Sequence, residues 1–391
     1  MGKVVLAVHE ACPFALSPSG DLPQVFRERS EELTQWLNRP ETIALLSSDP
    51  NLIMQPQPDT VPIASLEGLT DALKSSQPCR PENTPTPFLP AHYPLFDQIK
   101  KSRSYPVLAH SAFQPHIVWA DLLDYRWSII NNWFYLFATS HGVTHLALPP
   151  QCLQPNPLEP FPIESTVHLA FKMMSNLNPK HIDSRIDNVD EATAKQLENA
   201  GYTLSPAPPD YLYRRDEIVH LTGNKFRSQR AAVNQAARHK PLFRPFMPQD
   251  MKACLALFDQ WEKDAPDEIG RMMRQDARFA HVAAMKGEKT LRLTGRVVEV
   301  AGVIAGYTFG FSLTPNQFCI LIEIADRSIR GLSAWLFHEF CREQQGVEWI
   351  NTMDDSGLPN LAHAKSLWHP AQLIPCYTVT KRNSISSQIP R

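Results

Sequence analysis

The sequence lacks the closely spaced cysteine pairs that mark zinc sites and redox centres. Its seven cysteines contain no CxxC, and their number is odd. We therefore expect reduced thiols in the cytoplasm and no structural zinc. An apolar run long enough to cross a bilayer is also missing, and His9 and Glu10 interrupt the only apolar run near the start. We expect neither a transmembrane segment nor a cleaved signal peptide.

Several familiar motifs of catalysis and cofactor binding are absent as well. The chain contains no GxSxG, Walker loop, HExxH or GxGxxG, and its 14 histidines show no metal-ligand spacing. These absences give no support to a hydrolase of the GxSxG type, a P-loop enzyme, a zinc protease or a dinucleotide-binding enzyme. From the sequence we expect no bound metal and no resident cofactor.

Glycine is scarce beside proline, with 15 glycines against 35 prolines in 391 residues. The prolines concentrate in the first half, and residues 77–94 alone contain six. Such a run favours extended backbone, so we predict a Pro-rich N-terminal extension and linker over residues 1–94. Helices are expected near 21–40 and 66–74, and no function is assigned to this region.

The rest of the chain has the balance of a globular protein, with 43% hydrophobic residues, 20% charged residues and a net charge of -2. Its length favours two domains. We place a first α/β unit at 95–209, a second at 210–382 and a tail at 383–391. For the first unit the pattern predicts helices at 119–127, 163–177 and 190–200, with strands at 133–139, 181–186 and 206–214.

The second unit has a clearer order of elements. Helices are predicted at 248–261 and 268–285, followed by strands at 291–300, 303–311 and 318–324. A helix at 331–345, a strand at 347–351, a helix at 358–367 and a strand at 373–379 complete it. This succession is the layout of an acyltransferase of the GNAT type.

A basic stretch at 211–244 joins the two units. The spacing predicts a helix over 226–238 with one apolar side and one mostly cationic side. Guanidinium groups on such a helix can bind phosphates, although a solvated helix surface explains the pattern equally well. The residues assigned to substrate binding here are Lys225, Arg227, Arg230, Asn234 and Arg238.

Three blocks of residues resemble the catalytic domain of bacterial phosphatidylglycerol lysyltransferases. The first block comprises Gly223, Lys225, Phe226, Arg230 and Asn234. The second comprises Glu323, Ala325, Asp326 and Gly331. The third comprises Asn351, Asp355, Gly357, Leu361, Ala364, Lys365 and Pro370.

The resemblance implies two tandem GNAT-like units in an α/β fold. It also implies transfer of an aminoacyl group from charged tRNA to an amino or hydroxyl acceptor, which is a polar lipid in the best-known members. Aminoacyl-tRNA would be the co-substrate, without another cofactor. The protein would be cytoplasmic, with peripheral contact to anionic lipid at the inner membrane face.

Aminoacyl transfer needs a held acceptor, a group that takes its proton and donors for the developing oxyanion. We assign Glu323 or Asp326 to orient or deprotonate the acceptor, although a carboxylate there can also cap the next helix. Asp355 faces the same choice. Lys365 is assigned to the oxyanion or the tRNA 3′ end, and Asn351 to substrate binding.

Two alternatives remain open from the sequence. The loop at 326–333 supplies Gly331 for a CoA pyrophosphate, so a CoA-dependent N-acyltransferase using acetyl-CoA is one. The other is a non-catalytic binding protein of the same fold. It follows from departures from the family pattern, which fall at Ala231, Thr352, Met353, Ala362, Ser366 and Leu367.

Overall fold

The computed structural model describes residues 85–89, 92–93, 107–153, 163–178, 184–263 and 268–381. The helices expected near 21–40 and 66–74 and the tail at 383–391 lie outside these residues. The chain divides into two compact units. Among the described residues, unit 1 contains those before residue 103 together with 126–137 and 150–153, and unit 2 contains those of 103–125, 138–149 and 161–381.

Unit 1 is built on short strands. Within the Pro-rich run, strand β1 (Thr86–Pro87) pairs antiparallel with β2 (Asp124–Ile130), where Thr86 lies opposite Trp127. The predicted strand near 133–139 is confirmed as β3 (Trp133–Ser140), which pairs with β5 (Gln151–Cys152). The predicted helix over 119–127 is wrong, because the chain forms α5 (Phe113–Val118) earlier and enters β2 at Asp124.

Unit 2 contains a mixed sheet with the strand order β4-β6-β13-β7-β12-β11-β10-β9-β8. The early members of this sheet are β4 (Val143–Leu146), β6 (Arg185–Asp190), β7 (Thr203–Arg214) and β8 (Leu242–Pro245). The later members are β9 (Thr294–Val300), β10 (Val303–Thr314), β11 (Gln317–Ala325), β12 (Trp349–Asn351) and β13 (Gln372–Thr380). The later strands agree with the predicted order.

Helices of unit 2 also follow the sequence pattern closely. The helices α6 (Ile163–Leu177) and α7 (Glu191–Asn199) were expected, and the Asp190 side chain accepts a hydrogen bond from the Thr193 amide at the start of α7. After β7 come α8 (Arg215–His220), which was not predicted, and α9 (Arg227–Ala237). The remaining helices are α10 (Met251–Lys263), α11 (Glu268–Lys286), α12 (Leu332–Glu343) and α13 (Pro359–Ser366).

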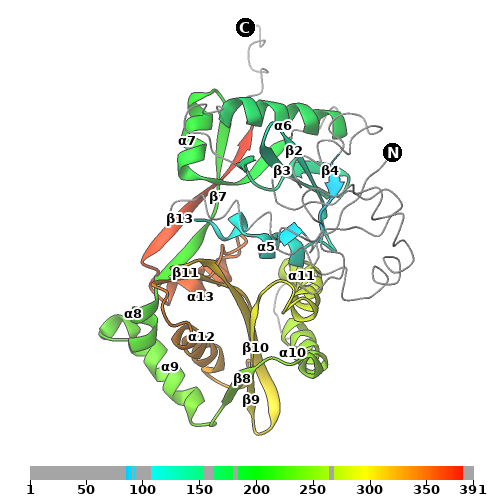
Figure 1. Ribbon diagram of the computed structural model, residues 1–391. Helices are drawn as coiled ribbons and strands as arrows, with labels where there is room; N and C mark the ends of the chain where they lie inside the picture. Colours follow the sequence, from blue (N-terminus) through cyan, green and yellow to red (C-terminus); the bar gives the residue numbers. More distant parts are fainter. Residues whose placement is uncertain are drawn as a thin grey trace, which may run out of the picture. The chain divides into compact units, whose positions relative to one another are not determined.

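The two faces of the sheet around β10 and β11 carry different helices (Figure 1). On one face α12 and α9 cover an apolar core that includes Phe340, Leu336 and Ala236. On the other face α10 and α11 pack, and His281 of α11 hydrogen-bonds the Tyr307 hydroxyl of β10 at 2.8 Å. The segment before α5 also covers the sheet, because Leu108 packs with Leu212 of β7 and Trp349 of β12.

This arrangement is a mixed α/β fold of the GNAT type, as the order of elements predicted. Two short 3-10 helices, which precede α5 and α9, carry residues of the site. The helix η3 (Ala109–Ser111) leads into α5, and η4 (Asn224–Phe226) leads into α9. Within the described residues, no helix combines the length and apolar character that crossing a membrane requires.

Candidate functional site

The central feature of the site is a fork between two parallel strands. Strands β11 and β12 pair only from Gln317 and Trp349 to Cys319 and Asn351. Beyond this point β11 continues to Ala325 and pairs on its other side with β10. Residues 320–325 therefore present one strand edge that β12 does not cover. We call this place the β11–β12 fork.

Lys365 stabilises the loop that follows β12, residues 352–358, through hydrogen bonds. Its ammonium donates hydrogen bonds to the carbonyls of Thr352, Met353 and Asp354, which uses all three N–H groups. The side chain lies over the Tyr211 ring, with 5.4 Å between the nitrogen and the ring centre. Burial lowers the pKa of Lys365, and the nearby carboxylates of Asp354 and Asp210 oppose that change.

Asn351 and Asp355 shape the same loop. The Asn351 amide oxygen accepts from the Met353 N–H at 2.6 Å, and its nitrogen donates to Asp210 at 2.8 Å. Asp355 accepts from the Tyr211 hydroxyl at 2.7 Å and from the Gly357 N–H at 2.9 Å. Both side chains are buried. The structure thus brings Asn351, Asp355 and Lys365 together as the framework of one loop.

Consecutive aspartates of this loop have partners on consecutive residues of β7. Asp355 bonds to Tyr211, whereas Asp354 lies beside Asp210. Neighbouring residues of a strand point to opposite faces of the sheet, so the two aspartates bind on different faces. His110 of η3 also lies beside these two aspartates. One imidazole nitrogen of His110 and one carboxylate oxygen each of Asp210 and Asp354 lie within 4.8 Å of one another. Burial raises the pKa of Asp210, while His110 and two hydrogen bonds lower it.

Glu323 projects from the part of β11 beyond the fork, on the side of α12. Its Oε1 lies 3.5 Å from the Ser333 hydroxyl, and its buried Oε2 has no hydrogen-bond partner in the described structure. Burial raises the pKa of Glu323 to about 8, slightly offset by the Ser333 hydroxyl. A carboxyl group with this pKa exchanges a proton readily near neutral pH.

Asp326 lies where β11 ends. Its Oδ1 accepts the Ser328 N–H at 2.8 Å, and its backbone N–H donates to the Ala305 carbonyl at 2.8 Å. The side chain thus stabilises the turn after β11, but it does not cap α12, whose N-cap is Gly331 without a side-chain hydrogen bond. The second carboxylate oxygen takes no part in this hydrogen bond.

The helix α9 has the two sides that its sequence predicts. Phe226, Gln229 and Ala236 are buried, and Arg227, Asn234 and Arg238 are exposed. Arg230 differs from the other cations, because its guanidinium donates to the carbonyls of Leu221 and Gly223 and so closes the end of α8.

Lys225, in η4 just before α9, forms an ion pair with Glu217 at 2.9 Å. We call Arg227, Arg230, Asn234 and Arg238 the cationic face of α9. Its contact with the loop region is indirect, through Gln229, whose amide donates to the Leu367 carbonyl after α13. The predicted site residues therefore fall into three groups, located on α9, on β11 and around the loop after β12.

The loop between β11 and α12 is closed by the backbone of α9. Gly331 has φ +83°, and a Cβ atom placed on it would lie 2.2 Å from the Ala232 carbonyl oxygen. Only a glycine permits this approach. In a CoA-dependent acyltransferase the pyrophosphate binds on the backbone amides of the corresponding loop, and here a turn of α9 lies against it.

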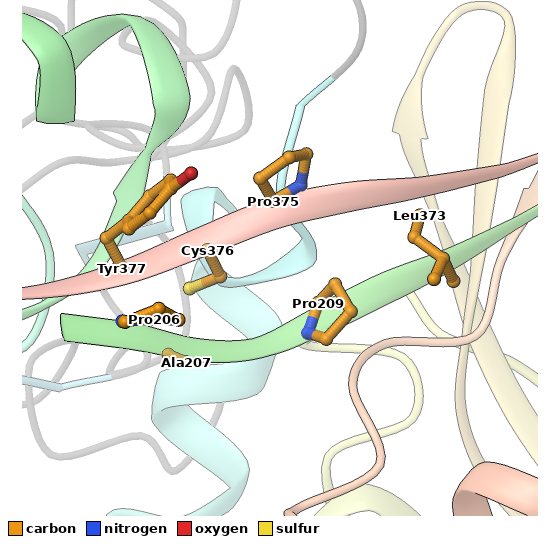
Figure 2. A pocket seen from close by; sticks show the side chains of 7 residues that line it. All are labelled: Pro206, Ala207, Pro209, Leu373, Pro375, Cys376 and Tyr377. Atoms are coloured by element: carbon orange, nitrogen blue, oxygen red, sulfur yellow. The ribbon is translucent and has the colours of Figure 1, made fainter.

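A separate apolar pocket of about 280 Å³ lies along the ribbon of β7 and β13. Figure 2 shows its lining of prolines with Leu373, Cys376 and Tyr377. Burial raises the pKa of the Cys376 thiol to about 12, so it is a poor nucleophile. None of the residues predicted for the site lines this pocket.

Sequence reasoning missed His110 and Asp210, which the fold brings beside Asp354. His110 lies far from the other two in the sequence, and no spacing rule connects them. A faint signal was present at Asp210, because a carboxylate in a strand between Pro209 and apolar Tyr211, Leu212 and Tyr213 needs a buried partner. The partner itself could be found only in three dimensions.

Comparison with known families decides the relationship. The model of the family "Phosphatidylglycerol lysyltransferase, C-terminal" matches residues 176–380, which is more than half of the chain. The chain belongs to this family. The match contains β7, the cationic face of α9, the β11–β12 fork and the loop after β12. The resemblance seen in the three sequence blocks is thereby confirmed.

Solved structures share the fold of this phosphatidylglycerol lysyltransferase family member at low identity. A conserved protein of unknown function from Bacteroides thetaiotaomicron has a TM-score of 0.64 at 20% identity, covering 76% of this chain and 99% of its own. L-PGS from Bacillus licheniformis has a TM-score of 0.53 at 12% identity and covers 77% of this chain and 95% of its own.

A third structure is the C-terminal domain of a protein assigned as a lysylphosphatidylglycerol synthetase, from Agrobacterium fabrum. It has a TM-score of 0.52 at 14% identity and covers 74% of this chain and 91% of its own. No curated protein sequence matches the chain. At these identities the structures establish the fold, and family and fold together indicate a transferase of the acyltransferase type.

Proposed function

We propose that the protein transfers an aminoacyl group from charged tRNA to an amino or hydroxyl acceptor at the β11–β12 fork. The observation that carries this proposal is the environment of the Glu323 carboxyl group. It stands beyond the fork with one unpartnered buried oxygen and a pKa raised by burial to about 8. A group of this kind can take a proton from an acceptor near neutral pH.

The proposed reaction needs no covalent enzyme intermediate. The acceptor nitrogen or oxygen attacks the ester carbonyl of the aminoacyl-tRNA, and its proton passes to the Glu323 carboxylate. A bond forms between the acceptor and the carbonyl carbon, and the bond to the tRNA ribose oxygen breaks. Glu323 then returns the proton to that departing oxygen, so the enzyme ends unchanged.

Asn351, Asp355 and Lys365 act as positioning residues in this proposal. Their polar atoms are used in holding residues 352–358, as in the bonds from Lys365 to the three loop carbonyls. An oxyanion role for Lys365 would require one of these bonds to break. Asp326 orients the acceptor through its second carboxylate oxygen, while the first maintains the turn before α12.

The cationic face of α9 is proposed to bind the phosphate backbone of the tRNA. Arg227 and Arg238 are exposed, and neither has a hydrogen bond or ion pair among the residues that the structure describes. Free guanidiniums are suited to bidentate contact with phosphate. If the acceptor is a polar lipid, the same region would meet anionic lipid at the inner membrane face, with the protein otherwise in the cytoplasm where charged tRNA is found.

The packing of α9 against Gly331 favours aminoacyl-tRNA over acetyl-CoA. A Cβ at Gly331 would lie 2.2 Å from the Ala232 carbonyl oxygen, so a turn of α9 packs closely against the loop that would hold a CoA pyrophosphate. We infer that this packing leaves little room for a pyrophosphate on that side of the loop. This is the reason for ranking the CoA-dependent reaction second.

Equilibrium binding across a salt series tests the proposal. Charged tRNA should bind with micromolar affinity that falls steeply as salt increases, because phosphate contacts release counterions. Acetyl-CoA should not bind. Acetyl-CoA binding without tRNA binding would support the CoA-dependent alternative, and binding of neither would support the non-catalytic alternative.

A further inference from the structure

A group of three potential ligands lies on the face of the sheet opposite α12. His110 comes from η3, Asp210 from β7 and Asp354 from the loop after β12. One imidazole nitrogen and one oxygen from each carboxylate lie within 4.8 Å of one another. Asp210 is buried, with 1% of its surface exposed, whereas the other two are half-buried. An ion could therefore enter from the solvent side.

Each carboxylate has one oxygen fixed by neighbouring amides and one oxygen left over. On Asp210 both donors reach Oδ2, namely the Ala109 N–H at 2.7 Å and the Asn351 amide at 2.8 Å. On Asp354 the Ser356 N–H reaches Oδ1 at 2.6 Å. Supporting hydrogen bonds of this kind orient the carboxylates of metal sites. The remaining oxygens are available for a ligand.

The formal charges around this cluster are unbalanced. Asp210 and Asp354 place two carboxylates on this face, and the Lys365 ammonium acts on both. Two carboxylates beside one ammonium leave a formal negative charge in a largely buried place. Burying unpaired charge is costly, and a bound cation would offset it.

We propose that His110, Asp210 and Asp354 bind a divalent transition-metal ion of the zinc or manganese class. An imidazole nitrogen with two carboxylates suits these ions better than Mg²⁺ or Ca²⁺, which prefer oxygen ligands alone. Ligands around a single Zn²⁺ lie roughly 3–3.5 Å apart, given bonds of about 2.1 Å. His110 and Asp354 would move by about 1 Å to reach that spacing from the present one.

The ion would have a structural role distinct from the proposed transfer chemistry. It would connect η3, β7 and the loop after β12, and so fix on one face the loop that Lys365 fixes on the other. The site was invisible in the sequence, where the histidine spacing indicated no metal. It depends on residues that only the fold brings together.

Zinc binding to the full-length protein tests this inference, after stripping with a chelator and reloading. Wild type should bind one Zn²⁺ per chain, and zinc should raise its melting temperature where Mg²⁺ does not. Asp354→Asn and His110→Gln should each weaken zinc binding by at least about tenfold. Glu198→Gln is the control, because it removes an exposed carboxylate of α7 and should keep zinc affinity within about threefold of wild type.

Cobalt substitution and a chelator control distinguish zinc bound by the three proposed ligands from zinc bound elsewhere and from effects of the substitutions themselves. Co²⁺ should give a spectrum of nitrogen and oxygen ligation without a sulfur charge-transfer band, since none of the proposed ligands is a cysteine. In chelator, Asp354→Asn should melt no lower than wild type, because the variant lacks one unpaired charge, so wild type should gain its advantage only when zinc is added. Failure of wild type to bind zinc, equal affinity in all the variants, or a thiolate spectrum would overturn the proposal.

Discussion

Lys365 donates a hydrogen bond to the Met353 carbonyl at 3.1 Å, from a helix to the loop after the preceding strand. The same ammonium also donates hydrogen bonds to the two neighbouring carbonyls. One buried ammonium therefore supports the whole turn. A lysine that appears in sequence as a possible catalytic cation thus has a clear local task. The first prediction concerns what happens when that support is removed.

Lys365→Met should destabilise the fold by about 2–4 kcal/mol, because three partly buried carbonyls lose their donor while the side-chain volume is kept. Turnover should fall more than substrate affinity, since the loop borders the fork. Urea unfolding and steady-state kinetics measure the two effects. Lys252→Met, at an exposed lysine of α10, is the control and should stay within about 0.5 kcal/mol of wild type. Equal behaviour of both variants would contradict the supporting role.

Gly331→Ala should cost at least about 3 kcal/mol of stability, because it adds a backbone clash with Ala232 to the strain of a positive φ. Gly346→Ala isolates the strain alone. Gly346 has a similar φ of +84° with nothing within 4 Å of the added Cβ, so its cost should be about 1–2 kcal/mol. Thermal unfolding of both variants gives the comparison, and equal losses would mean that α9 does not pack tightly on this loop.

Glu323 predicts a dependence of stability on pH. Its pKa is raised from 4.5 to about 8, so between these values the folded protein holds a proton that the unfolded chain has lost. The contribution of this group is therefore full below pH 4.5 and is lost as the pH rises toward 8. Melting curves of wild type and Glu323→Gln should diverge as the pH increases, with the variant the more stable at about pH 9.

The same group should set the pH dependence of turnover. As a general base Glu323 must be ionised, so kcat/KM should rise with pH and level off near the pKa of about 8. Glu323→Gln should abolish this rise and lower kcat by about 10²–10⁴-fold. A variant that kept the wild-type profile would assign the proton transfer to another residue.

The cationic face of α9 predicts a salt-dependent effect on tRNA binding. Reversing Arg227 and Arg238 together to glutamate should weaken binding by roughly tenfold and reduce the salt slope, because phosphate contacts are lost. Arg230 is unsuitable for this test, since it closes α8 through backbone carbonyls. Lys252→Glu on α10, which packs on the opposite face of the sheet, should leave both quantities unchanged.

The fold of unit 2 was largely accessible from the sequence, because its elements carry strong local patterns. Along η4 and α9, Phe226, Gln229 and Ala236 recur at helical spacing, and their side chains are buried. The segment 119–127 misled the prediction for a physical reason. Its end becomes a strand by pairing Trp127 with Thr86, a partner that lies in the Pro-rich run.

The site was accessible only in part. Motif blocks drew attention to Asn351, Asp355 and Lys365, which the structure does bring together. Their hydrogen-bond partners were not foreseeable, since local spacing says nothing about which side chain meets which carbonyl. The pairing of Asp210 with His110 and Asp354 depends on three separate segments, and periodicity carries no information on such contacts.

Transfer of a labelled amino acid from charged tRNA tests the central claim most directly. Purified protein would be mixed with a pool of labelled aminoacyl-tRNAs and with either polar lipid vesicles or small amines, alongside Glu323→Gln. We predict that the label moves to an acceptor with wild type and much more slowly with the variant. Label that stays on tRNA with every acceptor, together with acetyl transfer from acetyl-CoA, would contradict the account.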